Sequence, residues 1–430
     1  MSKKIRVLIF PCGAENALEI NDALKDCVNI EVFGASSVTD HGIFVYKNYI
    51  GNLPFINNPK FISAFNDIIV ENSIDVVFPT HDDVSLFFAE YLNEIKTKIA
   101  LPGLEQARIC RFKKLTYQEM KEYDFCPVVY HSVKSIVEYP VFAKPNVGQG
   151  SKFAKMVTGT EINFLLSAFK EDFVITEYLP GEEFTVDCFS DRHFNLRFIG
   201  PRKRNRVNAG ISQNSFTVPL TGEMESIAVT INQKLKMRGL WFFQVKQNKN
   251  GKLKLLEISV RAAGTMNLYR CLGVNFPLLT VYDLFDLDID IIKNENYLEV
   301  DRALFNKYKS DLVFDTIYID FDDTITKNGQ VNPIVMMFLY NVKNQGKKIH
   351  LITRHEHSLI ETMNYLGIHP EIFDNISQIK TAESKANYIT KKENSIFIDN
   401  AYKDRKDVKE KYGIPVFDVD AISSLIDWRN

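Results

Sequence analysis

The sequence predicts a protein of several domains that combines α/β and α+β architecture. At 430 residues the chain is too long for one typical hydrophobic core and fits two or three domains. β-type runs alternate with helical stretches over the first hundred residues and again after residue 312, which is typical of α/β units. From about Ile109 the intervening chain is richer in β-type segments, which favours an α+β domain.

A small α/β domain is expected over residues 1–108. Its β-type runs are residues 6–10, 29–33 and 75–78. Pro-Cys-Gly-Ala at 11–14 follows the first run, and Pro-Thr-His-Asp-Asp at 79–83 follows the third. Both segments connect a strand to a helix and could face a ligand, although helix capping is the more ordinary duty of the second segment.

Composition and charge are those of an ordinary soluble enzyme. Hydrophobic residues make up 45% and charged residues 25% of the chain, and the formal net charge is −2, so no nucleic-acid partner is expected. The apolar stretch at the N-terminus ends at Pro11 and is too short for a signal peptide or a membrane span. Six cysteines without a CxxC pair indicate reduced thiols, so we expect a cytoplasmic protein.

Residues 312–430 carry three β-type runs that each end in an oxygen-bearing side chain. The runs are residues 317–319, 349–352 and 395–398. The side chains that close them are Asp320, Asp322, Thr353 and Asp399. Helical stretches lie between consecutive runs, so the pattern predicts a parallel sheet. In such sheets the functional site lies beyond the carboxyl ends of the strands.

The order of these motifs resembles the haloacid-dehalogenase superfamily of phosphohydrolases. The resemblance implies that Asp320 is the nucleophile that forms an aspartyl-phosphate. It makes Asp322 the acid/base that protonates the leaving oxygen and then activates water. Thr353 would hold the phosphoryl oxygens, and Lys385, with Lys380 as a weaker match, would neutralise the nucleophile and the phosphate.

The same resemblance implies a Mg²⁺ site. Asp320 and Asp399, with Asp322 beside them, would supply the carboxylate oxygens that this cation prefers, and Asp404 could support them. Mn²⁺ could use the same ligands. The spacing of the motifs leaves no room for a large cap domain, so the domain would be capless. A simpler interpretation, that these side chains only form turns and helix caps, fits single motifs better than the ordered set.

The middle of the chain carries a second ordered set of motifs. Lys144 lies on an apolar strand that leads into a glycine loop at 148–151, and Glu-Tyr-Leu-Pro-Gly follows at 177–181. Glu257 lies in the later segment Leu-Glu-Ile-Ser-Val-Arg at 256–261. This order resembles the ATP-grasp enzymes, with the carbamoyl-phosphate-synthase-like branch as the closest pattern.

The resemblance covers about residues 1–300. It implies a pre-ATP-grasp α/β domain at 1–108 and an ATP-grasp domain at 109–300, with a flexible lid at about 140–183. A polar, charged stretch between Asn294 and Val313 marks the expected junction to the C-terminal domain.

The chemistry of the residues in this set fits ATP. A buried ammonium such as that of Lys144 requires a negative partner, which a phosphate would supply. Glycines let backbone amides close over that phosphate, and a strand-end segment can offer main-chain groups to adenine while Glu183 accepts from the ribose. The residues assigned to the nucleotide are Lys113 (with Lys114 as the alternative), Lys144, Gly148, Gly150, Ser151, Glu177, Tyr178, Leu179 and Glu183.

Metal binding is assigned to Gln244 and Glu257, which neighbouring strands would bring together as oxygen ligands of a Mg²⁺ that bridges the ATP phosphates. Ser259 stands where the family usually has Asn, which implies a weaker ligand. Arg261 is expected on the same strand face as Glu257, where it could stabilise the transferred phosphoryl group.

Two further arginines, Arg202 and Arg204, occupy alternate positions and could reach phosphate or the acceptor carboxylate bidentately. Simpler interpretations exist for each motif. Lys144 could extend along the surface, the loop at 148–151 could be a plain hairpin turn, and Glu257 could form a cross-strand ion pair with Arg261. The order and spacing of the whole set favour the ATP-grasp interpretation.

ATP-grasp enzymes typically phosphorylate a carboxylate, and an amine then attacks the acylphosphate to give an amide or peptide bond. The two resemblances together imply such a ligase fused to a phosphatase, acting on a carboxylate, an amine and a phosphorylated metabolite. A homo-oligomer is compatible with the sequence. Two alternatives are a phosphatase whose ATP-grasp region only binds nucleotide or serves as a lid, and a C-terminal domain that serves assembly without activity.

Overall fold

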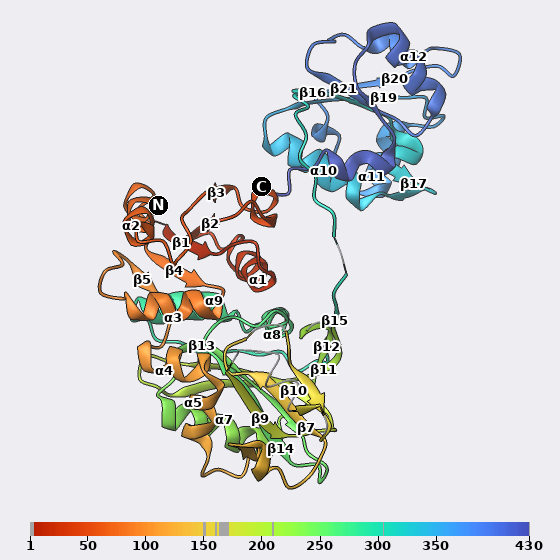
Figure 1. Cartoon of the computed structure of the whole chain (residues 1–430). Coiled ribbons are helices and arrows are strands. Elements are labelled where there is room, and N and C mark those ends of the chain that lie inside the picture. Colours follow the sequence, from red (N-terminus) through yellow and green to blue (C-terminus); the bar gives the residue numbers. More distant parts are fainter. Residues whose placement is uncertain are drawn as a thin grey trace. The chain divides into compact units, whose positions relative to one another are not determined.

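The computed structural model describes residues 4–148, 152–159, 161–162, 172–208, 210–303 and 305–429. The chain divides into two compact units, Met1–Leu304 (unit 1) and Phe305–Asn430 (unit 2), both drawn in Figure 1. The division falls in the polar stretch where the sequence predicts a domain junction. Among the described residues, no helix is both long and apolar enough to cross a membrane.

Unit 1 begins with a parallel sheet whose strand order is β3-β2-β1-β4-β5. The strands are β1 (Ile5–Phe10), β2 (Ile30–Ala35), β3 (Asn48–Ile50), β4 (Val76–Pro79) and β5 (Lys98–Ile99), with helices α1 (Glu15–Leu24), α2 (Phe61–Glu71) and α3 (Asp82–Glu90). Side chains alternate between the faces of a strand, so Val7 and Ile9 enter one apolar cluster while Leu8 and Phe10 enter another. The three strands predicted in this region are confirmed.

Two helices come next, α4 (Leu104–Arg111) and α5 (Lys113–Met120). The prediction that strands begin near Ile109 is therefore wrong. The helical signal is local: α4 has Glu105 in its first turn and Arg108 and Arg111 in its last, which complements the helix dipole.

A four-stranded antiparallel sheet follows, in the order β6-β9-β7-β8. Its strands are β6 (Val129–Tyr130), β7 (Val141–Pro145), β8 (Lys155–Val157) and β9 (Phe173–Glu177). Both faces of β9 are largely buried, and its last residue, Glu177, opens into the connection that leads to the next sheet.

The largest sheet of unit 1 has six strands in the order β14-β13-β10-β11-β12-β15, all antiparallel. These are β10 (Glu183–Ser190), β11 (Leu196–Asn208), β12 (Ile211–Thr217), β13 (Gly239–Gln247), β14 (Leu253–Ser259) and β15 (Glu299–Asp301), with helices α7 (Gly222–Leu235), α8 (Asn267–Cys271) and α9 (Phe276–Leu284). Helix α7 buries Met224, Ile227, Ile231 and Leu235, which recur at helical spacing, in the same cluster as Trp241 of β13.

Unit 2 is built on a parallel sheet in the order β20-β19-β16-β21-β22. Its strands are β16 (Thr316–Ile319), β19 (Lys348–Thr353), β20 (Asn375–Gln378), β21 (Ser395–Ile398) and β22 (Val416–Phe417). Its helices are α10 (Pro333–Asn344), α11 (Leu359–Leu366) and α12 (Tyr402–Tyr412). A separate strand pair joins β17 (Thr326–Lys327) to β18 (Gln330–Val331). The predicted parallel strands are confirmed. Because β16 lies between β19 and β21, the carboxyl ends of these three strands meet at one edge.

Candidate functional sites

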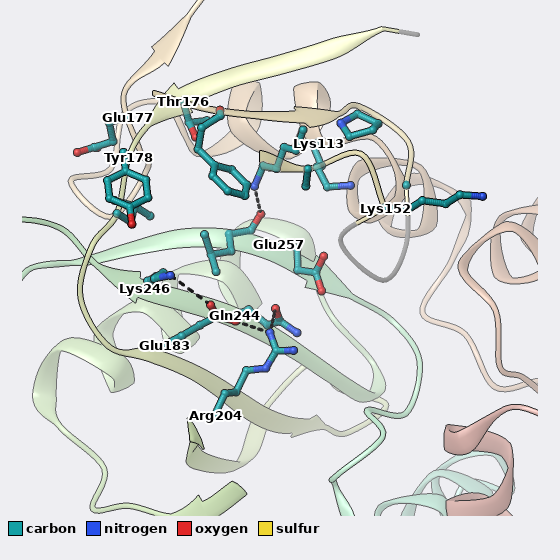
Figure 2. A pocket seen from close by; sticks show the side chains of 17 residues that line it. Lys113, Lys152, Thr176, Glu177, Tyr178, Glu183, Arg204, Gln244, Lys246 and Glu257 are labelled. Atoms are coloured by element: carbon teal, nitrogen blue, oxygen red, sulfur yellow. Dashed lines mark hydrogen bonds and ion pairs between the residues drawn. The ribbon is translucent and has the colours of Figure 1, made fainter. Parts of the chain in front are cut away.

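A cavity of about 160 Å³ in unit 1, the first cavity, is lined by residues from both antiparallel sheets (Figure 2). It gathers most of the residues that the sequence assigns to a nucleotide and its metal: Lys113, Lys144, Gly148, Glu177, Tyr178, Leu179, Glu183, Gln244 and Glu257. Gly150 and Ser151 lie outside the described residues. Lys152, Thr176 and Lys246 also line the cavity, and the sequence motifs did not single them out.

Lys144 of β7 is buried, with 7% of its surface exposed, so the interpretation as a surface lysine is wrong. Its Nζ donates to the Tyr117 hydroxyl at 2.6 Å and to the Leu256 carbonyl at 3.0 Å. Burial and the neighbouring Lys113 lower the pKa of Lys144 to about 7, against the opposing effect of Glu257 and Glu183. A bound anion would stabilise the charged form of Lys144, which its surroundings otherwise disfavour.

Lys113, at the start of α5, also lines the first cavity, and burial lowers its pKa. Lys114 pairs instead with Asp172 and is not among the described residues that line the cavity. The structure therefore favours Lys113 over Lys114 as the second phosphate-binding lysine.

The end of β9 forms one wall of the first cavity. Thr176, Glu177, Tyr178 and Leu179 line it in succession, and Figure 2 shows the first three together on one side. The Glu177 carboxylate accepts from the Val128 amide at 2.9 Å, which ties this segment to the chain before β6. Leu179 is buried, so this segment offers an apolar surface of the kind that an adenine ring requires.

Glu183 and Gln244 share one cation. Arg204 donates to the Glu183 carboxylate and, at 2.8 Å, to Gln244 Oε1. Lys246 Nζ lies 3.7 Å from Glu183. The Glu183 carboxylate thus lines the cavity but already contacts Arg204 and Lys246. A ribose hydroxyl would have to donate to a carboxylate that these two side chains also contact.

Gln244 and Glu257 are register partners across β13 and β14, as the sequence predicts. Among the described residues, no group of three or more His, Cys, Asp or Glu side chains is arranged to hold a metal ion. Mg²⁺ in nucleotide sites commonly takes one or two carboxylates and completes its shell with phosphates and water. The pair of oxygen ligands fits a cation of that kind.

A second cavity of about 440 Å³ adjoins the first. Gly148, Arg204, Gln244 and Glu257 line both cavities, so the two spaces meet at these residues. The second cavity also takes lining from the α/β domain, where Ala14, Glu15 and Asn16 follow β1 and Thr80, His81 and Asp82 follow β4. The strand-to-helix segments after β1 and β4 therefore both reach a cavity, and His81 of the second segment also caps α3.

Arg261 does not share a strand face with Glu257, because β14 ends at Ser259. It pairs with Asp82 of α3, at 2.9 Å and 3.2 Å, and lines the second cavity. The Ser259 hydroxyl donates to the same Asp82 at 3.1 Å, and Ser259 is not among the described residues that line either cavity. This placement argues against Ser259 as a metal ligand and gives Arg261 a partner that the sequence did not reveal.

Arg202 is only 2% exposed and makes a bidentate pair with Asp187 of β10, at 2.7 Å and 3.1 Å. Its third contact is the Thr265 hydroxyl at 2.6 Å. These contacts argue against Arg202 as a direct ligand of phosphate or acceptor. Arg202 lines the second cavity only, whereas Arg204, two residues further along β11, lines both cavities.

Unit 2 has a cavity of about 470 Å³, the third cavity, at the carboxyl edge of its sheet. Asp320, Asp322 and Lys385 line it, together with Arg354 and His355. Thr353 and Asp399 are fully buried beside it and are not among its described lining residues.

Lys385 lies between two carboxylates. Its Nζ is 2.6 Å from Asp320 and 2.8 Å from Asp399, and all three side chains are buried. Burial and the neighbouring Asp399 raise the pKa of Asp320, although Lys385 opposes the shift. Burial lowers the pKa of Lys385, but the two carboxylates outweigh it and raise that pKa above its usual value. Lys380 is exposed, so Lys385 is the lysine of this site.

Asp322 stands at the rim, where half of its side chain is exposed. It contacts His355 Nδ1 at 2.9 Å and accepts from the Thr353 hydroxyl at 3.4 Å. His355 Nε2 lies 2.8 Å from the Thr362 hydroxyl. No motif pointed to His355, because its role depends on the turn that follows β19.

Asp404, expected to support the metal, makes a bidentate pair with Arg354, with both distances 2.7 Å, and lies 3.9 Å from Lys385. It therefore supports the charged cluster through Arg354. Asp320 and Asp399 have the oxygen chemistry that Mg²⁺ prefers. The Lys385 ammonium currently holds both, so a cation would have to share them with it.

Comparisons with known proteins match part of unit 1. Residues 169–303 match a family model described as ATP-grasp in the biosynthetic pathway with Ter operon. A search of curated proteins found no match. Unit 1 thus contains an ATP-grasp domain, and the chain shows the mixed α/β, multidomain architecture expected of it.

Several solved structures are similar. A biotin carboxylase from Campylobacter jejuni, in a complex with β-γ-ATP, is 14% identical with a TM-score of 0.57, covering 68% of this chain and 74% of that one. An L-amino acid ligase from Bacillus licheniformis is 16% identical with a TM-score of 0.53, covering 66% and 75%. An N5-carboxyaminoimidazole synthetase from Staphylococcus aureus is 12% identical with a TM-score of 0.55, covering 67% and 79%. At these identities the similarity shows the fold alone.

Proposed function

We propose that unit 1 is an ATP-dependent ligase that joins a carboxylate to an amine through an acylphosphate. The observation that carries this proposal is the shared wall of the first and second cavities, formed by Gly148, Arg204, Gln244 and Glu257. A nucleotide in the first cavity would present its terminal phosphate where an acceptor in the second cavity presents its carboxylate. The names of the similar L-amino acid ligase and N5-carboxyaminoimidazole synthetase support a ligase.

In the first step, a carboxylate oxygen attacks the γ-phosphorus of ATP. The bond from that phosphorus to the β,γ-bridging oxygen breaks, which leaves ADP and an acylphosphate. In the second step, the nitrogen lone pair of the amine attacks the acyl carbon, the carbon–oxygen bond to phosphate breaks, and the amine proton leaves to solvent. Amide, ADP and phosphate are the products.

The protein's share is positioning and charge neutralisation. Lys144 and Lys113 would hold the phosphates from the β7 side of the first cavity, and Arg204 would stabilise charge where the two cavities meet. Gln244 and Glu257 would hold Mg²⁺, which when bound neutralises phosphate charge. The segment 176–179 would hold the adenine.

ADP release tests this proposal. Wild-type protein with ATP, Mg²⁺ and pools of carboxylates and amines should form ADP only when both substrates are present. Glu257→Gln should strongly reduce this signal at a limiting Mg²⁺ concentration, whereas Glu225→Gln, on the exposed face of α7, should not. ADP formation that needs no carboxylate would contradict the proposal.

For unit 2 we propose a phosphohydrolase, because Lys385 holds two carboxylates at the carboxyl edge of a parallel sheet with Asp322 at the rim. Asp320 would attack phosphorus while Asp322 gives a proton to the leaving oxygen, whose bond to phosphorus breaks. Asp322 would then take a proton from the water that attacks the aspartyl-phosphate and frees phosphate.

Asp320→Asn in the whole chain should abolish hydrolysis of a generic aryl phosphate and leave ADP formation by unit 1 unchanged. Asp407→Asn, on α12, is the matched control. Equal hydrolysis by wild type and Asp320→Asn would remove the phosphatase assignment and leave the ligase assignment untouched.

A further inference from the structure

Charges of both signs line the second cavity. Each of its four arginines pairs with a carboxylate. Two of these pairs have both members in the cavity wall, Arg261 with Asp82 at 2.9 Å and Arg302 with Glu15 at 2.8 Å. With Glu257, the wall carries three carboxylates beside the four arginines, so a ligand can find side chains of either charge sign there. A ligand that carries both a positive and a negative group could bind by replacing one partner in each of two such ion pairs.

A buried hydroxyl in the wall of the second cavity lacks a partner. Thr185 of β10 is 1% exposed, and its Oγ1 makes no hydrogen bond in the described part of the chain. Two other buried side-chain atoms share this property, Ser85 Oγ and Asn267 Oδ1, but neither residue lines one of the three cavities. A buried polar group without a partner costs stability, and a ligand in the second cavity could supply the partner that Thr185 Oγ1 lacks.

Thr185 is well placed for an acceptor carboxylate. It is the register partner of Gln244 on β13, and Gln244 lines both cavities. The cavity volume of about 440 Å³ lies within the range of small-molecule sites. Glu15 of α1 belongs to the N-terminal α/β domain, and 44% of its side chain is exposed, so its carboxylate could contact a positively charged group of a ligand.

We infer that the acceptor in the second cavity is amphoteric: a small molecule with both a carboxylate and a primary amine, such as an α-amino acid or a short peptide. Its reacting carboxylate lies at the shared wall, where Thr185 donates to it and Arg204 balances its charge. Its amine lies toward Glu15 or Asp82. This inference rests on the proposed ligase function and adds the class of its acceptor.

The test uses the whole chain with ATP and Mg²⁺ and measures ADP formation with three substrate pools. The first holds the twenty common amino acids and their simple dipeptides, the second holds N-acetylated counterparts, and the third holds dicarboxylates and sugar acids without an amine. Each pool is supplied with hydroxylamine as a general nucleophile for the acylphosphate. The first pool alone should support ADP formation.

ADP formation with the second or third pool but not the first overturns the inference. So does the absence of ADP with every pool while ATP with Mg²⁺ still binds by calorimetry. If the wild-type protein does not bind ATP at all, the proposed ligase function fails together with the inference about its acceptor. Calorimetry therefore distinguishes failure of the inference alone from failure of both.

Two matched pairs of variants locate the acceptor. Thr185→Val removes the unpartnered hydroxyl and should raise the KM for the active amino acid roughly tenfold, with the KM for ATP and the melting temperature preserved. Ser85→Ala, which removes the other unpartnered hydroxyl, should change neither KM. Arg302→Ala should raise the acceptor KM, whereas Arg206→Ala, which breaks an exposed pair with Asp301, should not. An unchanged acceptor KM in both Thr185→Val and Arg302→Ala would place the acceptor elsewhere.

Discussion

Gln244 and Glu257 face each other across the antiparallel strands β13 and β14, and both line the first and the second cavity of unit 1. One strand pair therefore places both proposed oxygen ligands where nucleotide and acceptor would meet. The pairing would let two residues thirteen positions apart in the sequence hold one metal ion, as the proposed function requires.

Replacing Glu257 by Gln should weaken Mg²⁺ at this place. Loss of an outer-sphere partner of a metal typically costs about 10–100-fold in affinity or activity, and loss of a direct ligand should cost more. We expect a raised Mg²⁺ concentration for half-maximal ADP formation, measured at saturating ATP. An unchanged Mg²⁺ dependence would exclude Glu257 as a ligand.

The pKa of Lys144, lowered to about 7 by burial and by Lys113, makes nucleotide affinity depend on pH. Above pH 7 the free protein holds Lys144 mostly neutral, whereas a bound phosphate raises its pKa again. ATP binding at pH 8 should therefore take up a proton, and affinity should fall as the pH rises above about 7.

Calorimetry at pH 8 in buffers of different ionisation enthalpy measures this proton uptake directly. Lys144→Met should bind more weakly and lose the uptake that Lys144 supplies. Uptake of the same size in the variant and in the wild type would assign the proton to another group.

Lys113 and Lys114 are adjacent in sequence but differ in surroundings, since Lys113 lines the first cavity and Lys114 pairs with Asp172. Hydrogen bonds to charged groups contribute roughly 1.5–3 kcal/mol, so Lys113→Met should weaken ATP binding at least about tenfold. Lys114→Met should change the Kd by less than about twofold, because an exposed ion pair contributes little. The reverse ranking of the two Kd values would move the phosphate to the other lysine.

Lys385→Met should destabilise unit 2, because it leaves Asp320 and Asp399 buried without their shared cation. Breaking a buried pair in this way costs about 3–5 kcal/mol. The loss should be largest at pH 8 and smaller at low pH, because the raised pKa of Asp320 lets it take up a proton and removes the repulsion.

Amide hydrogen exchange of β16 and β21, corrected for intrinsic rates, reports this difference in the whole chain at two pH values. Lys391→Met, which breaks an exposed pair with Asp315, is the control and should cost under about 1 kcal/mol. A loss in Lys385→Met that grows as the pH falls would contradict the assigned direction of the Asp320 pKa.

The strands and the main site residues could be predicted because their signals are local. Alternating or continuous apolar runs located β1, β4, β16, β19 and β21, and polar residues at their ends located the sites. Lys144 was found from the apolar strand that carries it, and Lys385 from its match to the motif lysine of the haloacid-dehalogenase resemblance.

Residues whose role depends on distant partners could not be predicted. Asp82 meets Arg261 and Ser259 across about 180 positions, and Arg202 is held in a bidentate pair by Asp187 on the neighbouring strand. Strand alternation cannot place Arg261 either, because β14 ends two residues before it. Such pairings depend on how the sheets and helices pack together, and this packing cannot be predicted from local patterns in one sequence.

Isothermal titration of ATP with Mg²⁺ against wild-type protein, the Lys144→Ala, Glu257→Ala double variant and Lys114→Ala would settle whether the first cavity is a nucleotide site. We predict micromolar binding to wild type and Lys114→Ala and none to the double variant. Equal binding to all three proteins, or no binding to wild type, would contradict a working ATP site in unit 1.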